Sequence, residues 1–287
     1  MQLVADYGAL SSAHIYALRE AKTAGAIRRL QERLSRLFHN GYLHRPVQQF
    51  IFHAQRHFFA AQYGQDKSSH YLVYTLSQKG ADEIFLDDPE RRKQISWQTR
   101  LHNRQYLNLW HALMVAEFHV TLSLLERGSE GIKLGEWRQG EDINRQAPQV
   151  AVPSKKGMIK KAIKPDAYFT LEKDGQVRHF FLEADRSTMT TIRFTEKLKA
   201  YWRLWKEKKH TQHFGIGERV GFRVLTTTIS EARAVNLCRA AKESDDTRSG
   251  SNMFYFTCAH YVDFEHPDSL LQAIWKTPAG EEKHSLV

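Results

Sequence analysis

The hydrophobic pattern at the start of the chain predicts a short helix, a turn and a longer helix. A helix over residues 14–19 follows the capping pair Ser11-Ser12, and a second helix over residues 26–39 stops at Asn40-Gly41. The apolar positions of the second helix keep the spacing of one buried face; they are Ile27, Leu30, Leu34 and Leu37. Its other faces carry Arg28, Arg29, Arg33 and Arg36.

The residues after the helix over 26–39 are predicted to complete a first domain. A β-strand is predicted over residues 70–75 and a helix from Ser77 towards Phe85, whereas residues 47–69 fit neither period. A helix-turn-helix followed by a possible β wing describes a winged helix, so residues 1–88 are predicted to form a winged-helix DNA-binding domain. The charged residues that follow Asp87-Asp88 mark residues 89–102 as a linker.

The remainder of the chain alternates between helical and strand periods. A long amphipathic helix is predicted over about residues 103–125. Strands are predicted over 132–137, 143–152, 222–227 and 253–258, and helices over 191–208, 231–242 and 268–276. This order predicts an α/β (α+β) domain with a mixed sheet over residues 103–278, followed by a flexible tail over 279–287.

The strongest local signal is a β-hairpin between these elements. Asp174-Gly175 lies between two hydrophobic runs, which favours a two-residue turn. Counting outward from this turn pairs Lys173 with Gln176 and Asp166 with Glu183. One face of the hairpin is apolar and is predicted to be buried; it consists of Ala167, Phe169, Leu171, Phe180, Leu182 and Ala184.

The opposite face gathers carboxylates at the end away from the turn. Asp166 and Glu183 would lie about 5 Å apart at Cβ, with Asp185 one step beyond them and opposite Lys164. Because such close carboxylates repel one another, a divalent cation among them is predicted, and oxygen ligands suit Mg²⁺ or Mn²⁺. The alternative is a solvated strand end with one acid paired to Lys164.

The charge balance favours a polyanionic partner. Lys and Arg number 42 against 32 Asp and Glu, which gives a formal charge of +10. DNA is the first candidate and an anionic membrane surface the second. The start of the sequence lacks the pattern of a signal peptide and no stretch is apolar enough to span a bilayer, so a cytoplasmic protein is expected. Hydrolase triads, phosphate-binding glycine loops and dinucleotide fingerprints are absent, which argues against those enzyme classes.

Two basic segments are candidates for contact with DNA. The arginines of the second helix lie where a helix-turn-helix contacts phosphates and bases. The segment between Asn144 and Pro165 contains no acidic residue and reads as a flexible basic loop. It leads directly into the carboxylate cluster and would hold phosphates through Lys155, Lys156, Lys160 and Lys161. A solvated loop is the alternative.

These motifs resemble known families. Pro165-Asp166, a hairpin, and then Glu183-Ala184-Asp185 before a helix look like the PD-(D/E)xK nuclease core, in which the two acids bind Mg²⁺. The wider pattern includes the winged helix, the segment from His111 to Glu117, and Lys197 with Tyr201 in the helix after the hairpin. Together with the hairpin motif, these features resemble the replication-relaxation (MobC-like) proteins of plasmids and other mobile elements. This resemblance implies DNA binding in replication, mobilisation or control of an element.

One position departs from the nuclease motif. Asp185 occupies the place of the motif lysine, so a nuclease would need a substitute, and the candidates are Lys164 and Lys197. The first long helix of such folds can add an acid to the site, and here that residue would be Glu117. The predicted metal ligands are therefore Asp166, Glu183, Asp185 and Glu117.

Three interpretations follow from the sequence. The first is a DNA-binding protein of a plasmid or mobile element whose nuclease-like domain grips duplex DNA without cutting it. The second is an active Mg²⁺-dependent endonuclease that uses Asp166 and Glu183. The third is an adapter for protein partners whose positive charge is incidental. A homodimer and other proteins of the element's DNA-processing complex stay open as partners.

Overall fold

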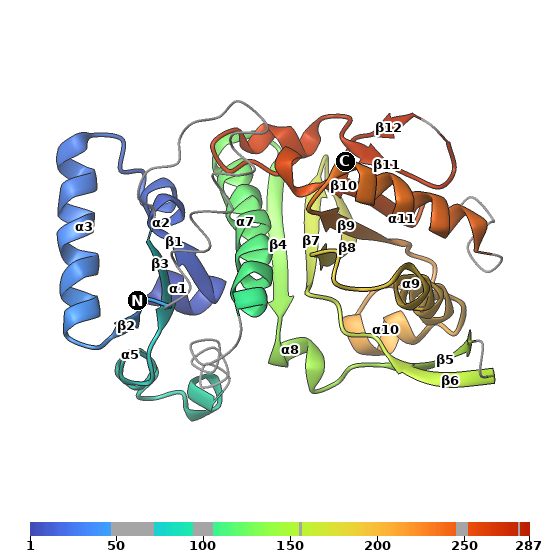
Figure 1. Cartoon of the computed structure of the whole chain (residues 1–287), viewed down its shortest axis with the longest axis horizontal. Helices are drawn as coiled ribbons and strands as arrows, with labels where there is room; N and C mark the ends of the chain where they lie inside the picture. Colours follow the sequence, from blue (N-terminus) through green and yellow to red (C-terminus); the bar gives the residue numbers. More distant parts are fainter. Residues whose placement is uncertain (47–71, 94–105, 155–156, 245–251, 281) are drawn as a thin grey trace. The chain divides into compact units, whose positions relative to one another are not determined.

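The computed structural model describes residues 1–46, 72–93, 106–154, 157–244, 252–280 and 282–287 (Figure 1). The chain divides into two compact units, Met1–Val120 and Thr121–Val287. The division falls within helix α7 (Tyr106–Gly128) and not at the linker expected over 89–102. In its first half, Leu109 and Leu113 are buried against Ala9 and Val73. This half of the helix therefore belongs to the core of the first unit.

The first unit contains the predicted pair of helices and a small sheet. Its elements are α1 (Gln2–Tyr7), β1 (Ala9–Ser11), α2 (Ser12–Leu18), α3 (Ala24–His39), β2 (Leu43–His44), β3 (Val73–Leu76) and α5 (Gln78–Ile84). Among its described residues, three strands form an antiparallel sheet in the order β1, β3, β2. The unassigned residues 47–69 lie outside the described part of the chain.

Side-chain caps explain why the predicted helices start where they do. The Ser11 hydroxyl accepts a hydrogen bond from the His14 amide, and the Thr23 and Ser77 hydroxyls do the same for Ala26 and Gly80. The sequence pattern missed α1 and β1. Each is at most six residues long, and the Met1 cap of α1 forms no side-chain hydrogen bond, so neither has a strong local signal.

The second unit is built on a mixed sheet. Its elements after α7 are β4 (Ile132–Gln139), α8 (Glu141–Asn144), β5 (Gln149–Ser154), β6 (Gly157–Ala162), β7 (Ala167–Lys173), β8 (Gln176–Asp185), α9 (Thr191–Lys206), α10 (Lys209–Phe214), β9 (Phe222–Thr228), α11 (Glu231–Glu243), β10 (Phe254–Cys258), two 3₁₀ helices (Ala259–Tyr261 and Pro267–Leu271), β11 (Trp275–Lys276) and β12 (Lys283–His284). Among the described residues, seven strands form one sheet in the order β12, β11, β10, β9, β8, β7, β4. Strands β8, β9 and β10 are parallel, and the other pairs are antiparallel.

The hairpin β7–β8 has the predicted register. Lys173 pairs with Gln176, and Ala167 pairs with Leu182. Asp174 and Gly175 both have positive φ angles, 53° and 73°, as a tight turn between twisted strands requires. The apolar face is buried as expected, and the face that carries Phe181 and Glu183 is buried as well, under α9 and α11. Because this second face is buried, Glu183 and Asp185 are removed from bulk solvent.

Four predicted segments differ from the structure. The strand predicted over 143–152 begins only at Gln149, because residues 141–144 form helix α8. Residues 268–276 are not an α-helix, because β11 pairs with β10 through Phe256 and Lys276. The tail over 279–287, expected to be flexible, adds strand β12 and buries Leu286 completely. The basic segment is not a flexible loop: residues 149–154 and 157–162 pair as a two-stranded antiparallel ribbon. Strands β11 and β12 pair with residues that a local pattern cannot identify. Strands β5 and β6 are adjacent in the sequence, but no Asn-Gly or Asp-Gly turn signal lies between them.

The fold class is confirmed as mixed α/β with a large mixed sheet. In Figure 1, α9, α10 and α11 lie together beside β8, β9 and β10. No helix among the described residues is both long and apolar enough to cross a membrane.

Candidate functional site

The acidic end of β8 forms a densely hydrogen-bonded polar site in the second unit. Glu183 is 3% exposed. One carboxylate oxygen, Oε2, accepts a hydrogen bond from Lys197 Nζ, and the other, Oε1, accepts one from the Tyr201 hydroxyl. Both donors lie on α9, one helical turn apart, so they face the same strand end. Helix α9 thus satisfies the acid that β8 buries.

Burial shapes the protonation of this group. It raises the pKa of the Glu183 carboxyl to about 7; Lys197 opposes the shift and the nearby Asp166 carboxylate adds to it. Burial alone would lower the pKa of the Lys197 ammonium, but Glu183 and Asp166 outweigh it, so the net direction is upward. Burial and then Glu183 raise the pKa of Tyr201 well above its usual value. Lys197 and Tyr201 therefore remain protonated donors at neutral pH.

Asp185 has a cation of its own. Arg233 Nε donates to Asp185 Oδ2 at 2.8 Å and Arg233 Nη2 approaches Asp185 Oδ1 at 3.4 Å. The Thr228 hydroxyl donates to Oδ2 at 3.3 Å. The Asp185 side chain is 6% exposed, so this is a buried ion pair. The expected partner, Lys164, is exposed, and Asp185 is held by an arginine from the first turn of α11 instead.

Asp166, Glu183 and Asp185 each bond to different groups of the protein. Asp166 Oδ2 accepts a hydrogen bond from the Ala184 amide at 2.8 Å, which fixes the acid against β8. No group of three or more His, Cys, Asp or Glu side chains lies close enough to hold a metal ion in the part of the chain that the structure describes. As the side chains lie, the oxygens of Glu183 and Asp185 are used by Lys197, Tyr201 and Arg233. This arrangement does not fit a divalent ion.

Glu117 is engaged within the first unit. Its Oε2 lies 2.8 Å from Nε2 of His14, a residue that is 2% exposed. The Ser11 amide donates to His14 Nδ1, so the ring proton is on Nε2 and points to the carboxylate. The pair ties α2 to α7. A metal-binding role for Glu117 stays a prediction.

The predicted arginines of α3 are all exposed. Arg28, Arg29, Arg33 and Arg36 lie on the surface of this helix. Of the four apolar positions predicted to form its buried face, Leu34 is buried and the other three are partly exposed. Arg28 Nε pairs with Glu32 Oε1 at 3.2 Å, with both side chains largely exposed. Such a pair contributes little to stability, about 0.3–0.5 kcal/mol. The guanidinium groups of α3 are therefore accessible to an anionic partner.

The predicted lysines of the basic segment separate into different environments. Lys160 is exposed on β6. Lys161 instead packs on α9, where its Nζ donates to the Arg193 carbonyl at 3.3 Å and to Glu196 Oε2 at 3.2 Å. Lys155 and Lys156 lie outside the described residues.

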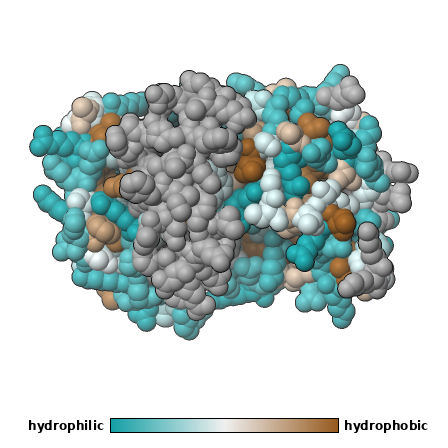
Figure 2. Space-filling model, viewed as in Figure 1, coloured by the Kyte–Doolittle hydropathy of each residue, from teal (hydrophilic) through white to brown (hydrophobic). Residues whose placement is uncertain are grey.

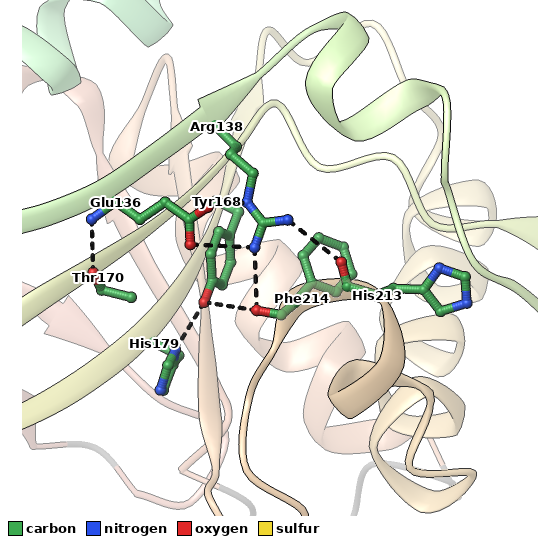
Figure 3. A network of polar contacts seen from close by, with 7 residues as sticks. All are labelled: Glu136, Arg138, Tyr168, Thr170, His179, His213 and Phe214. Atoms are coloured by element: carbon green, nitrogen blue, oxygen red, sulfur yellow. Dashed lines mark hydrogen bonds and ion pairs between the residues drawn. The ribbon is translucent and has the colours of Figure 1, made fainter.

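A second polar network fixes the other half of the sheet (Figure 3). Arg138 on β4 lies over the Tyr168 ring, with Cζ 4.5 Å from the centroid, and donates to the Phe214 carbonyl at 3.1 Å. The Tyr168 hydroxyl bonds to His179 Nδ1 at 2.8 Å, and burial raises the pKa of Tyr168 to about 12. The guanidinium thus caps the C-terminal end of α10, where backbone carbonyls lack helical partners.

The family model for replication-relaxation matches residues 1–220 of the chain. This is more than half of its 287 residues. The chain belongs to the replication-relaxation family. The match includes the arginines of α3, the hairpin with Asp166 and Glu183, and Lys197 on α9. No curated protein and no solved structure matches the chain.

The sequence pattern of this replication-relaxation protein did not single out Arg233. The residue lies beyond the family match, in a helix whose N-cap is Ser230. Its signal was indirect: β8 and β9 are parallel, so the residues that follow β9 come near the end of β8. Tyr201 was part of the motif, but its bond to Glu183 becomes visible only when α9 packs on the sheet.

Proposed function

We propose that this chain binds double-stranded DNA and acts in the replication, mobilisation or processing of a plasmid or other mobile element. Membership of the replication-relaxation family suggests such a role and an association with DNA. The excess of basic over acidic residues, 42 to 32, supports a polyanionic partner.

The observation that carries the proposal is the exposed basic face of α3. In a winged-helix interpretation, α2 and α3 form the helix-turn-helix, and α3 is the helix that enters the major groove. Its four exposed arginines, Arg28, Arg29, Arg33 and Arg36, would contact phosphates and base edges. Strands β2 and β3, which follow α3, would form the base of the wing.

The second unit is proposed to hold DNA without cutting it. The acids at the end of β8 are neutralised by Lys197 and Arg233, and removing those cations would leave buried charges unpaired. This favours a stable, internally satisfied site over one that recruits a metal ion. A second copy of the chain or other proteins of the element's DNA-processing complex would be compatible partners.

Binding to a labelled DNA duplex tests this function. Replacing Arg28, Arg29, Arg33 and Arg36 together by alanine is expected to weaken affinity by about two orders of magnitude at moderate salt, because several phosphate contacts are lost. A control that replaces Arg239 and Lys242, two exposed cations of α11, should keep affinity within about threefold. Equal affinity of the α3 variant and the wild type would contradict the proposal.

A Mg²⁺- or Mn²⁺-dependent endonuclease is the second candidate. The observation that favours it is Lys197, which reaches Glu183 as a replacement for the motif lysine would. Asp166 and Glu183 would be the ligands, although the present hydrogen bonds of Glu183 do not fit that role. The test is to incubate supercoiled plasmid with the protein and either ion. If the wild type cleaves the plasmid and Asp166→Ala does not, this candidate is supported. If the wild type cleaves no more than the variant does, this candidate is removed.

A further inference from the structure

The basic segment forms a ribbon that stands apart from the main sheet. Among the described residues, β5 and β6 pair with each other and with no other strand. Their register runs from Gln149 opposite Ala162 to Ser154 opposite Gly157. In Figure 1 the ribbon runs along the lower edge of the second unit, beside α9.

One face of the ribbon is anchored. Val150 and Val152 are 1% and 0% exposed and belong to the core that α9 covers. The ion pair of Lys161 with Glu196 ties β6 to the same helix. On β5, the Gln149 carbonyl accepts a hydrogen bond from Lys209 Nζ at 2.8 Å. These contacts hold one face of the ribbon against the core and α9 and leave the other face outward.

The outer face combines small and apolar residues with two long polar side chains, Gln149 and Lys160. Ala151 lies opposite Lys160, and Pro153 lies opposite Met158. Ala151, Met158 and Lys160 are exposed, and Met158 is 61% exposed. Hydrophobic side chains on the visible surface occur as separate spots among hydrophilic ones (Figure 2). Met158 lies opposite Pro153 on a two-stranded ribbon that is anchored to the core.

The charge of this segment fits DNA. Residues 145–165 contain no Asp or Glu, so no carboxylate of the segment opposes a phosphate. Lys160 is exposed on the outer face, between Ala162 and Met158 along β6. A two-stranded ribbon fits a DNA groove, and small residues such as Ala151 and Ala162 allow its backbone to approach the groove floor closely.

We infer that the outer face of β5–β6 enters the minor groove of double-stranded DNA and that Met158 inserts between base pairs and kinks the duplex. The inference rests on the proposed function, because duplex DNA is its partner. Met and Pro are among the apolar wedges that minor-groove proteins insert, with kinks of about 20–90°. Lys160 would contact a flanking phosphate. The wedge would favour flexible pyrimidine–purine steps.

Energy transfer between dyes at the two ends of a short duplex measures the bend. The full chain is titrated onto the duplex, and binding is followed in parallel by anisotropy. Wild type is expected to shorten the end-to-end distance, and Met158→Ala to lose most of that shortening. Affinity should stay within about fivefold, because the lost apolar contact is offset by the unstacking that is avoided.

Val177→Ala is the matched control. Val177 is also an exposed apolar residue of a β-hairpin, 51% exposed, but it lies in β8 opposite the acidic Glu172. This variant should bend DNA as wild type does. Met158→Phe should retain the bend, because a larger apolar wedge still unstacks the step. A minor-groove ligand such as distamycin should reduce the bend of the wild-type complex.

The outcomes separate this inference from the function on which it rests. Binding without a bend, or an equal bend for wild type and Met158→Ala, overturns the wedge and leaves DNA binding intact. A bend that distamycin does not reduce overturns the minor-groove assignment. Absence of any duplex binding at low salt overturns the proposed function and this inference together.

Discussion

Glu183 shows at the scale of one residue how the second unit tolerates a buried acid. Its carboxyl group is nearly inaccessible, and the energetic cost of removing it from water is offset by an ammonium and a phenol on α9. Asp185, two residues on, has a separate arginine. The alternation of β8 was enough to predict that the two acids share a face. Their partners were harder to predict, because Arg233 is 48 residues away.

The raised pKa of Glu183 makes a prediction about stability and pH. A carboxyl whose pKa is about 7 when folded and 4.5 when unfolded stabilises the fold fully below pH 4.5. This contribution falls between those values by up to about 1.4 kcal/mol per pH unit. The free energy of unfolding of wild type minus that of Glu183→Gln should therefore decrease from pH 5 to pH 7, as measured by urea unfolding. A difference that grows over this range would contradict the assignment.

The Asp185–Arg233 pair should be essential for stability. Arg233→Leu leaves a buried carboxylate without its cation, which is expected to cost about 3–5 kcal/mol in the free energy of unfolding. Arg239→Leu, at an exposed position of the same helix, should change stability by less than about 0.5 kcal/mol. Chemical denaturation of both variants measures the two effects. If both variants lost a similar, small amount of unfolding free energy, Arg233 would not be what stabilises the buried Asp185 carboxylate.

At the scale of elements, the structure separates what a local pattern can specify from what it cannot. The β7–β8 hairpin was predictable in register because the turn and both strands are adjacent in the sequence. The same holds for α3, whose cap and stop signals flank it directly. Strands β11 and β12 are two residues each and exist only through pairing with β10 and with each other. The sequence therefore predicted a helix over 268–276, where the structure has β11.

The bulge in β4 is another feature that depends on its neighbour. The register of β4 on β7 shifts between Leu134 and Trp137. At this point the Thr170 hydroxyl accepts a hydrogen bond from the Glu136 amide at 2.9 Å. A Cβ on Gly135 would lie 2.3 Å from that hydroxyl oxygen. Glycine is thus required by a close approach between strands.

Gly135→Ala is expected to destabilise the protein by about 1–3 kcal/mol, because the added methyl group must displace Thr170. Adding Thr170→Ala should recover part of this loss in thermal or urea unfolding, since the clashing atom is removed. Gly128→Ala is the control, because a Cβ at the end of α7 meets nothing within 4 Å. If the double variant were less stable than the wild type by the full sum of the costs of the two single changes, the clash would not be the cause.

At the scale of the whole molecule, the chain combines a basic helix in its first unit with an internally neutralised acidic site in its second. The family match spans both the α3 arginines and the Glu183 site, so these features belong to one replication-relaxation protein. The sequence predicted the fold class, since charge and period are local properties, whereas the roles of the candidate site residues stay predictions. It could not predict that the acids would be occupied by Lys197, Tyr201 and Arg233, because that follows from packing α9 and α11 on the sheet.

The salt dependence of duplex binding tests the central claim, that α3 holds DNA through its arginines, most directly. Arg29 and Arg33 are the informative pair, because Arg28 already pairs with Glu32. If each contacts one phosphate, the slope of log K against log salt should become shallower by about two units in Arg29→Ala/Arg33→Ala. The control Arg239→Ala/Lys242→Ala should keep the wild-type slope. An unchanged slope in the α3 variant would contradict the account.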